Sequence, residues 1–200
     1  MELLDVGAST RATTFQMTWT IHPHEDRMQA LLALADLMPD IFTFTTLNLI
    51  DILEPLPTDS LDYTFGADHT IYLSRTRHPS RVTAAEILAP SNLTGQAFDF
   101  AEMNHDKPLQ DRRRDPHATT AAHVADHAAA RLRKAILAQD LGSITVPPHV
   151  GLELNDVIAY DDLLVDAAQI KARVRAITTT FDRRPGRRPI FEQKIHLGGL

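Results

Sequence analysis

Hydrophobic residues recur at two different spacings along this chain of 200 residues, and the two spacings predict strands and helices in turn. An alternating pattern over residues 15–20 predicts a strand, and a helical spacing over about 23–39 predicts a helix with acidic residues in its first turn. β-branched and aromatic residues over 41–53 favour extended structure. Two extended patterns separated by a short polar turn then predict a hairpin over residues 69–88.

The second half of the chain begins with a polar stretch and continues with a long helix. Residues 104–115 are expected to be a connector rather than core. Asp115 then fits the N-cap, and Pro116 the first position, of a helix that ends at about Gln139, before Gly142. Its small apolar residues repeat at steps of four and three, which predicts one seam that can approach a neighbour closely. The seam consists of Ala118, Ala122, Ala125, Ala129, Leu132 and Ile136.

Strand patterns fill the rest of the chain, over residues 143–146, 157–160, 170–181 and 189–197. The last two flank the turn-forming segment 182–186 and predict an antiparallel hairpin. The predicted fold class is α+β, mainly antiparallel β, in three parts. They are an N-terminal α+β region with the hairpin 69–88 (residues 1–103), the polar connector with the Ala-rich helix (104–141), and a C-terminal antiparallel β domain (142–200).

Composition and charge narrow the functions that this chain can have. The absence of cysteine excludes disulfides, thiolate metal sites and cysteine nucleophiles. No apolar run has the length of a membrane span, and the sequence predicts a soluble protein without a secretion signal. The net charge of −6 disfavours sequence-independent binding of nucleic acid. The charge is unevenly divided, because residues 1–100 hold five basic and thirteen acidic residues, whereas residues 101–200 hold fifteen and thirteen.

Two groups of histidines are candidates for a metal or acid–base site. His123 and His127 are four apart on the predicted long helix, a spacing that can place two imidazoles on one metal ion. Val124 stands where a metalloprotease helix carries its glutamate, so a solvated polar helix face is the preferred interpretation. The second group, residues 22–26, holds two histidines and two carboxylates, but acidic residues at a helix start are explained by the helix dipole. No catalytic residue, metal or cofactor is therefore predicted.

Arginine-rich runs are the remaining candidates, and a contact between subunits explains them best. Arginine pairs with carboxylates through a planar fork and is favoured in protein interfaces, and no aromatic residues for stacking bases are interleaved with these runs. Together with four residues of the helix seam they form the predicted interface. Its members are Arg112, Arg113, Arg114, Ala122, Ala125, Ala129, Leu132, Arg183, Arg184, Arg187 and Arg188.

The order of these features resembles the C-terminal part of the phage tail hub family, the baseplate and tail-tip proteins. A polar connector and an Ala-rich helix precede a short strand, the run 151–158 (GLELNDVI) introduces the next strand, and a long strand pair closes the chain. Phe181 and Asp182 stand at the turn of that pair, and the segment 197–199 (LGG) stands at its end, as in the family. The resemblance covers about residues 40–200.

The resemblance implies β-barrel-like hub domains with a long connecting helix, and a structural role without catalysis. A hub links the tail tube to the tip or baseplate through subunit assembly, so the implied partners are other tail or baseplate proteins and further copies of the chain, as a trimer. The implied location is the tail of the virion, after assembly in the host cytoplasm. Hubs of this family are longer and carry an additional N-terminal β-barrel. This chain could therefore be a truncated gene product, a fragment or a minimal version of a hub, and these alternatives stay open.

Two other functions stay open beside the hub. One is a small metal-dependent hydrolase that uses His123 and His127. The other is an α+β module for protein interaction with no assigned partner. The ordered series of elements supports the tail hub and gives no support to either of these two functions.

Overall fold

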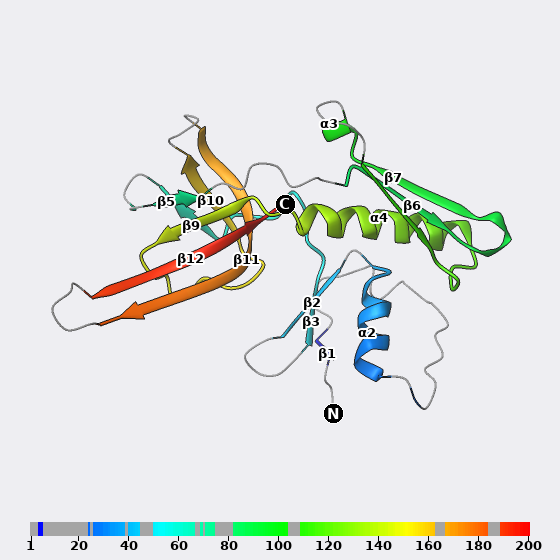
Figure 1. Ribbon diagram of the computed structural model, residues 1–200, viewed down its shortest axis with the longest axis horizontal. Coiled ribbons are helices and arrows are strands. Elements are labelled where there is room, and N and C mark those ends of the chain that lie inside the picture. The colour runs from blue at the N-terminus through cyan, green and yellow to red at the C-terminus, as the bar shows by residue number, and fades with distance from the viewer. Residues whose placement is uncertain are drawn as a thin grey trace. The chain divides into compact units, whose positions relative to one another are not determined.

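The structure is a computed structural model that forms two compact units, and each is described by itself (Figure 1). Unit 1 consists of Met1–Pro55 and Val82–Ala135, and unit 2 consists of Leu56–Arg81 and Ile136–Leu200. The division of the sequence into residues 1–103, 104–141 and 142–200 stays a prediction. The structure describes residues 4–5, 24, 26–38, 40–44, 50–66, 69, 71–74, 82–103, 109–162, 167–183 and 189–200, so the strand predicted over 15–20 lies outside the described residues.

Unit 1 contains two small three-stranded sheets. In the first, the order is β1 (Leu4–Asp5), β3 (Ile50–Leu53) and β2 (Ile41–Phe44), with β3 parallel to β1 and antiparallel to β2. The helix α2 (Arg27–Ala35) precedes β2, and the backbone N–H of Met28 donates to the Asp26 carboxylate at 2.9 Å at its start. This confirms the helix predicted between residues 23 and 39 and the extended structure predicted after it.

The second sheet of unit 1 has the order β7 (Thr94–Phe98), β6 (Ala84–Leu88) and β8 (Gln110–Arg114). β6 is antiparallel to β7 and parallel to β8. A short 3-10 turn, η1 (Pro90–Asn92), joins β6 to β7, and the helix α3 (Phe100–Met103) follows β7. Residues 110–114 were expected in a polar connector, and that expectation is wrong. β8 is a mostly exposed edge strand, and its polar residues give no apolar alternation to detect.

The long helix α4 (Ala121–Leu137) packs on this second sheet. Thr120 caps it, since its hydroxyl accepts from the His123 backbone N–H at 3.2 Å, whereas the sequence predicted Asp115 as the cap. The core of this contact is formed by Ile87 on β6 and by Ala118, Val124 and Ala128. Gly95 on β7 completes the contact, because a Cβ there would overlap the Val124 carbonyl and lie 2.7 Å from the Ala125 nitrogen.

Replacing Gly95 by alanine should therefore destabilise unit 1. The added methyl group meets helix backbone, which cannot move aside as a side chain can, so we expect Gly95→Ala to cost about 1–3 kcal/mol of unfolding free energy. Chemical denaturation followed by circular dichroism measures this cost. Gly66→Ala is the matched control, because a Cβ at Gly66 meets nothing within 4 Å. Equal stability of the two variants would contradict the close approach.

Unit 2 is built on one six-stranded sheet. The order is β4 (Tyr63–Phe65), β10 (Val157–Asp162), β11 (Ala167–Asp182), β12 (Ile190–Gly198), β9 (Gly142–Val146) and β5 (Tyr72–Ser74). Neighbours are antiparallel except β4 and β10, which are parallel. The sheet curls into a half-barrel (Figure 1). The buried set includes Phe65, Ile144, Ile158, Val174, Ile195 and Leu197.

The sequence predicted the C-terminal strands and their hairpin correctly, but the hairpin over residues 69–88 is wrong. β5 pairs with β9 in the sheet of unit 2, whereas β6 pairs with β7 and β8 in unit 1. The two strands are close in sequence, but each finds its partners elsewhere in the chain. A short polar turn such as 78–80 is compatible with a hairpin and does not require one.

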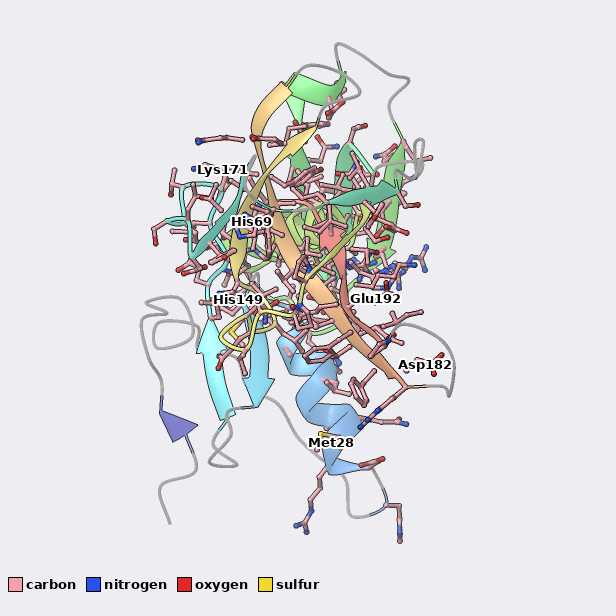
Figure 2. All side chains as sticks on the ribbon, turned by 90° about the vertical axis from the view of Figure 1, so that its left-hand side faces the viewer. Met28, His69, His149, Lys171, Asp182 and Glu192 are labelled. Atoms are coloured by element: carbon pink, nitrogen blue, oxygen red, sulfur yellow. The ribbon has the colours of Figure 1, made fainter. Side chains whose placement is uncertain are left out.

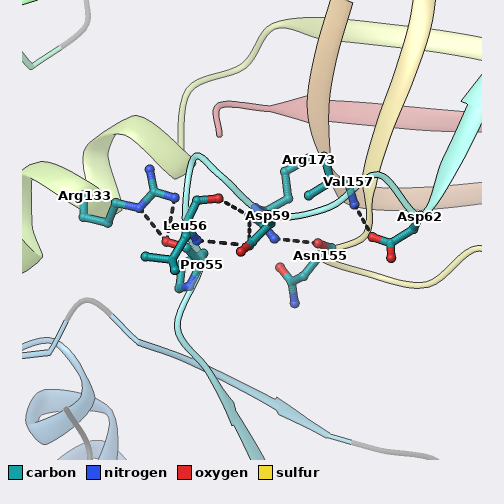
Figure 3. Close-up of polar contacts among 8 residues, drawn as sticks. All are labelled: Pro55, Leu56, Asp59, Asp62, Arg133, Asn155, Val157 and Arg173. Atoms are coloured by element: carbon teal, nitrogen blue, oxygen red, sulfur yellow. Dashed lines mark hydrogen bonds and ion pairs between the residues drawn. The ribbon is translucent and has the colours of Figure 1, made fainter. Parts of the chain in front are cut away.

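Arg173 on β11 holds the start of unit 2 in place (Figure 3). Its side chain is only 5% exposed, and its Nη1 donates to the Asn155 carbonyl at 2.8 Å. Its Nη2 donates to the Leu56 carbonyl at 3.3 Å and forms an ion pair with Asp59 at 2.6 Å. The segment that leads into β4 is thus attached to a strand more than a hundred residues later.

Arg173→Lys should destabilise unit 2, because a lysine keeps the charge but cannot reach three acceptors with one planar fork. We expect a loss of about 1–3 kcal/mol in unfolding free energy. The matched control is Arg175→Lys, two residues along the same strand at an exposed position, which should change stability little. A loss as large in the control as in Arg173→Lys would contradict the role of the fork, because Arg175 is exposed.

The fold class is α+β and mostly strands, as the sequence predicted. None of the described helices combines the length and the apolar character that crossing a bilayer requires.

Candidate assembly interface

The hairpin of β11 and β12 is longer than the strands beside it. β11 and β12 pair over nine positions, but β10 accompanies β11 only as far as Arg173, and β9 accompanies β12 only from Gln193. Residues 180–182 and 190–192 therefore pair with each other and with no third described strand. This part, called the outer ribbon below, extends beyond the rest of the sheet (Figure 1).

The outer ribbon carries aromatic side chains that no described part of the chain covers. Phe181 and Phe191 lie directly opposite each other on one face, with ring centroids 5.7 Å apart at 88°, and they are 66% and 58% exposed. Ile190, opposite Asp182, exposes its side chain on the other face. The two phenylalanines leave on the order of 200 Å² of apolar surface in water. Covering that surface would contribute about 5 kcal/mol before the entropy cost of association.

The sequence analysis named the arginines of the tip as interface residues and did not name the two phenylalanines. Arg183 is exposed at the end of the ribbon, next to Asp182, which Figure 2 shows at the outer end of β11. The other tip arginines, Arg184, Arg187 and Arg188, lie outside the described residues. The signal for the phenylalanines is the difference in predicted strand length, because a run of twelve residues cannot be covered along its whole length by neighbours of four residues each.

The arginines predicted on the connector lie on β8 in unit 1, where all three are exposed. Arg112 forms an ion pair with Glu86 at 2.7 Å, and Arg113 contacts Asp111 at 3.4 Å. Burial disfavours ionisation of Asp111, but hydrogen bonds and charge from Arg131 and Arg113 outweigh it and hold the pKa of Asp111 below its usual value. Arg112 and Arg113 therefore already form ion pairs within the sheet of unit 1.

The alanine seam predicted on the long helix is not the face that packs on the sheet. Ala122 and Ala125 are exposed, Ala129 is half-buried and Leu132 is buried. The face that packs on the sheet holds Val124 and Ala128, one residue from the seam positions and so about 100° around the helix. Because two of its alanines are exposed, the interface predicted on this helix stays a prediction.

The shift of the buried face has a polar cause, the pair of His127 and Asp115. His127 was expected on a solvated face, but it is buried and its Nδ1 lies 3.0 Å from a carboxylate oxygen of Asp115, which is itself buried. The carboxylate can only accept, so Nδ1–H donates. The other Asp115 oxygen accepts from the His117 backbone N–H at 2.8 Å. Asp115 thus orders the segment before α4 and fixes the rotation of the helix.

Among the described residues, no group of three or more histidine, aspartate, glutamate or cysteine residues could hold a metal ion. The hydrolase alternative therefore stays a hypothesis without a located metal site. Of the second histidine group, only His24 and Asp26 are described; both are exposed, and Asp26 caps α2.

A third pair of histidines belongs to the packing of unit 2. His69 and His149, labelled in Figure 2, both contact Tyr63. The Tyr63 hydroxyl lies 3.1 Å from Nε2 of His69, and the rings of Tyr63 and His149 are 4.0 Å apart. Phe65 lies against the same cluster, so the group acts as an aromatic end of the core.

The chain has the fold of prophage tail proteins. It superimposes on the 43 kDa tail protein of prophage MuSo2 from Shewanella oneidensis with a TM-score of 0.63 at 15% identity, covering 90% of this chain and 56% of that one. A tail protein from Neisseria meningitidis MC58 matches with a TM-score of 0.59 at 13% identity, covering 90% and 57%.

The chain thus spans a little over half of the tail proteins that it resembles. No protein-family model matches it, and no curated protein matches its sequence. The likeness is one of fold.

The His127–Asp115 pair predicts a loss of stability in mild acid. Burial lowers the pKa of His127 and outweighs the opposite effect of Asp115. Since the pKa is lower in the folded state than in the unfolded state, protonation favours unfolding. Stability is therefore lost as the pH falls from about 6.5, the unfolded value, through the folded pKa.

Comparing unfolding free energies at pH 7.5 and 5.5 tests this prediction. His127→Gln keeps a donor for Asp115 but cannot titrate, so its stability should fall less than that of the wild type over this interval. His24→Gln, at an exposed position, should retain the wild-type pH dependence. A wild-type pH dependence in His127→Gln would show that His127 does not carry the effect.

Proposed function

We propose that this chain is a structural component of a phage or phage-like tail hub or baseplate, which links the tail tube to the tip through subunit assembly and performs no catalysis. The observation that carries the proposal is the outer ribbon, a two-stranded extension with exposed aromatic residues. A hairpin of this kind is marginally stable in water by itself, so it is suited to being covered by another subunit. The fold shared with prophage tail proteins supports the same role.

The partners proposed are other tail or baseplate proteins and further copies of the chain, as a trimer in the tail of a virion assembled in the host cytoplasm. Exposed strand edges support this choice. β8 is an edge strand in unit 1, and β4 and β5 are the edges of the sheet in unit 2. Unpaired edges are commonly covered by assembly, because each presents a row of backbone donors and acceptors.

Removal of the aromatic pair should weaken assembly without unfolding the chain. We expect Phe181→Ser/Phe191→Ser to weaken self-association, or binding to a tail-tube protein, by about tenfold or more, since large exposed aromatic residues dominate interface energies. Sedimentation velocity of the purified full chain, alone and mixed with tail-tube protein, measures both. For the wild type, the association should persist on dilution, at concentrations where incidental contacts dissociate.

Leu154→Ser is the matched control. Leu154 is 55% exposed, close to the exposure of the two phenylalanines, and the next residue, Asn155, bonds to Val174. Val174 lies seven residues from Phe181 along β11, roughly 23 Å in an extended strand. The control should associate as the wild type does. A wild-type chain that stays monomeric at tens of micromolar and does not bind tail-tube protein would refute the proposed function.

A further inference from the structure

The strand β11 has a backbone edge that no described strand covers. β10 pairs with β11 only as far as Arg173, and the backbone of Val174 bonds instead to Asn155 and Asp156. From residue 176 to residue 181, β11 pairs with β12 on one side and with no described strand on the other (Figure 1). Every second residue of this segment directs its N–H and C=O groups to the uncovered side. The segment 176–181 is called the open edge below.

The open edge lacks the features that usually keep a strand edge apart from other strands. Its sequence, AITTTF, contains no charged residue and no proline, and four of its residues are threonine or isoleucine, which favour strands. Edges that stay in solvent are commonly protected by charges, prolines or bulges. The bulge in β11 lies before the open edge, between Val174 and Ala176. In unit 1, by contrast, the edge strand β8 carries three arginines.

The open edge is complementary to a second copy of itself. When two open edges run antiparallel around a two-fold axis at Thr179, Ile177 of each copy lies opposite Phe181 of the other. Thr178 then lies opposite Thr180, and each of these pairs forms twice. Aromatic residues opposite β-branched residues, and threonines opposite each other, are pairs that stabilise antiparallel sheets.

Neighbouring two-fold registers fit less well. If the axis moves one residue toward the tip, Ile177 lies opposite Arg183. If it moves one residue the other way, Asp182 lies opposite Val174, whose backbone is already bonded to the segment before β10. In the register centred on position 179, residues 176–182 pair with themselves and no like charges lie opposite each other.

We propose that two copies of this chain pair through their open edges, with β11 of one copy antiparallel to β11 of the other and Thr179 at the two-fold axis. The two hairpins then form one four-stranded sheet. Pairing uses the backbone, so the threonine side chains stay on the faces of the sheet, whereas the exposed ring of Phe181 gains Ile177 of the second copy as a neighbour.

This contact is isologous, because the same surface meets itself, and it therefore closes as a dimer. The inference goes beyond the proposed function, since a trimer would use another surface. A single pair of edge strands is a small interface, so a weak dimer is expected, and the measurements need concentrations up to about 200 µM.

A charge swap at the two-fold axis tests the contact, because Thr179 there meets its own counterpart. Thr179 is exposed, so Thr179→Lys and Thr179→Glu should both fold, which circular dichroism checks. Each variant alone places like charges opposite each other, and we expect its dimer dissociation constant to rise about fivefold. An equimolar mixture should dimerise at least as well as the wild type, since lysine then faces glutamate. Sedimentation velocity of the full chain measures all three samples.

Thr179→Gln is the matched control, because it is close to lysine and glutamate in size and carries no charge. It should dimerise as the wild type does. The inference is overturned if the mixture associates no better than the single variants, or if both single variants dimerise as well as the wild type.

Cysteine cross-linking tests the register, since the natural chain has no cysteine. Thr179→Cys should form a disulfide-linked dimer on oxidation, because residues opposite each other in antiparallel strands are close enough for a disulfide. Glu192, labelled in Figure 2, is exposed on β12, and two Glu192→Cys positions would be about 14 Å or more apart in the proposed dimer. We expect at least about tenfold less dimer from Glu192→Cys. A higher yield from Glu192→Cys would indicate pairing through β12 and overturn the inference.

The same samples separate failure of this inference from failure of the proposed function. If the wild type self-associates or binds tail-tube protein, but the charge swap does not restore dimers, the proposed function stands and the edge-pairing inference is wrong. If the wild type does neither, both are wrong.

Discussion

The pairing of β11 with β12 is the constraint on which unit 2 depends. Each strand uses its second edge for one further neighbour, β10 beside β11 and β9 beside β12, and these in turn carry β4 and β5 at the two edges of the sheet. Every other strand of the unit is therefore positioned from this ladder. The same ladder continues past its neighbours to form the outer ribbon, so the core of the unit and its candidate interface are two parts of one hairpin. A change that shifts the register of the hairpin would move both.

Arg173 lies at the last position of β11 that pairs with β10, where the covered part of the strand ends. A buried guanidinium is costly unless it is bonded, and here the acceptors for its two terminal nitrogens come from a turn before β10 and from the segment before β4. The side chain thereby brings the two sequence segments of unit 2 together. In unit 1, Asp115 has a comparable role, since one carboxylate orders the chain before α4 and sets the rotation of the helix. In both units a buried charge specifies an arrangement that apolar contacts alone would leave less defined.

Sequence patterns predicted those elements whose determinants are local. The helix α4, the strand β9 and the hairpin of β11 and β12 each show their period and their turn within a short window. The pairing of β5 with β9 and of β6 with β8 could not be predicted in this way, because these partners are distant in sequence. The local pairing of β6 with β7 was missed. β8 was not predicted, because an edge strand can be polar on both faces. The buried face of α4 was predicted wrongly, because His127 has its partner twelve residues earlier in the chain. The sequence placed part of its candidate interface on this same hairpin, through the charges of the tip and not through the aromatic residues, and that interface stays a prediction.

The excess length of the β11–β12 ladder over its neighbouring strands indicates a candidate interface more directly than the charges or the family resemblance do. A ladder can be covered only as far as its neighbours extend, and the predicted runs already differ, twelve residues over 170–181 against four over 143–146. The excess must extend into solvent or reach another molecule. In a purely monomeric protein, selection would favour polar residues on such an extension, as the three threonines at 178–180 illustrate. Phenylalanines at 181 and 191, directly opposite each other on one face, are instead what a covered surface requires. The change from threonine to phenylalanine along β11 marks where contact with solvent should give way to contact with a partner.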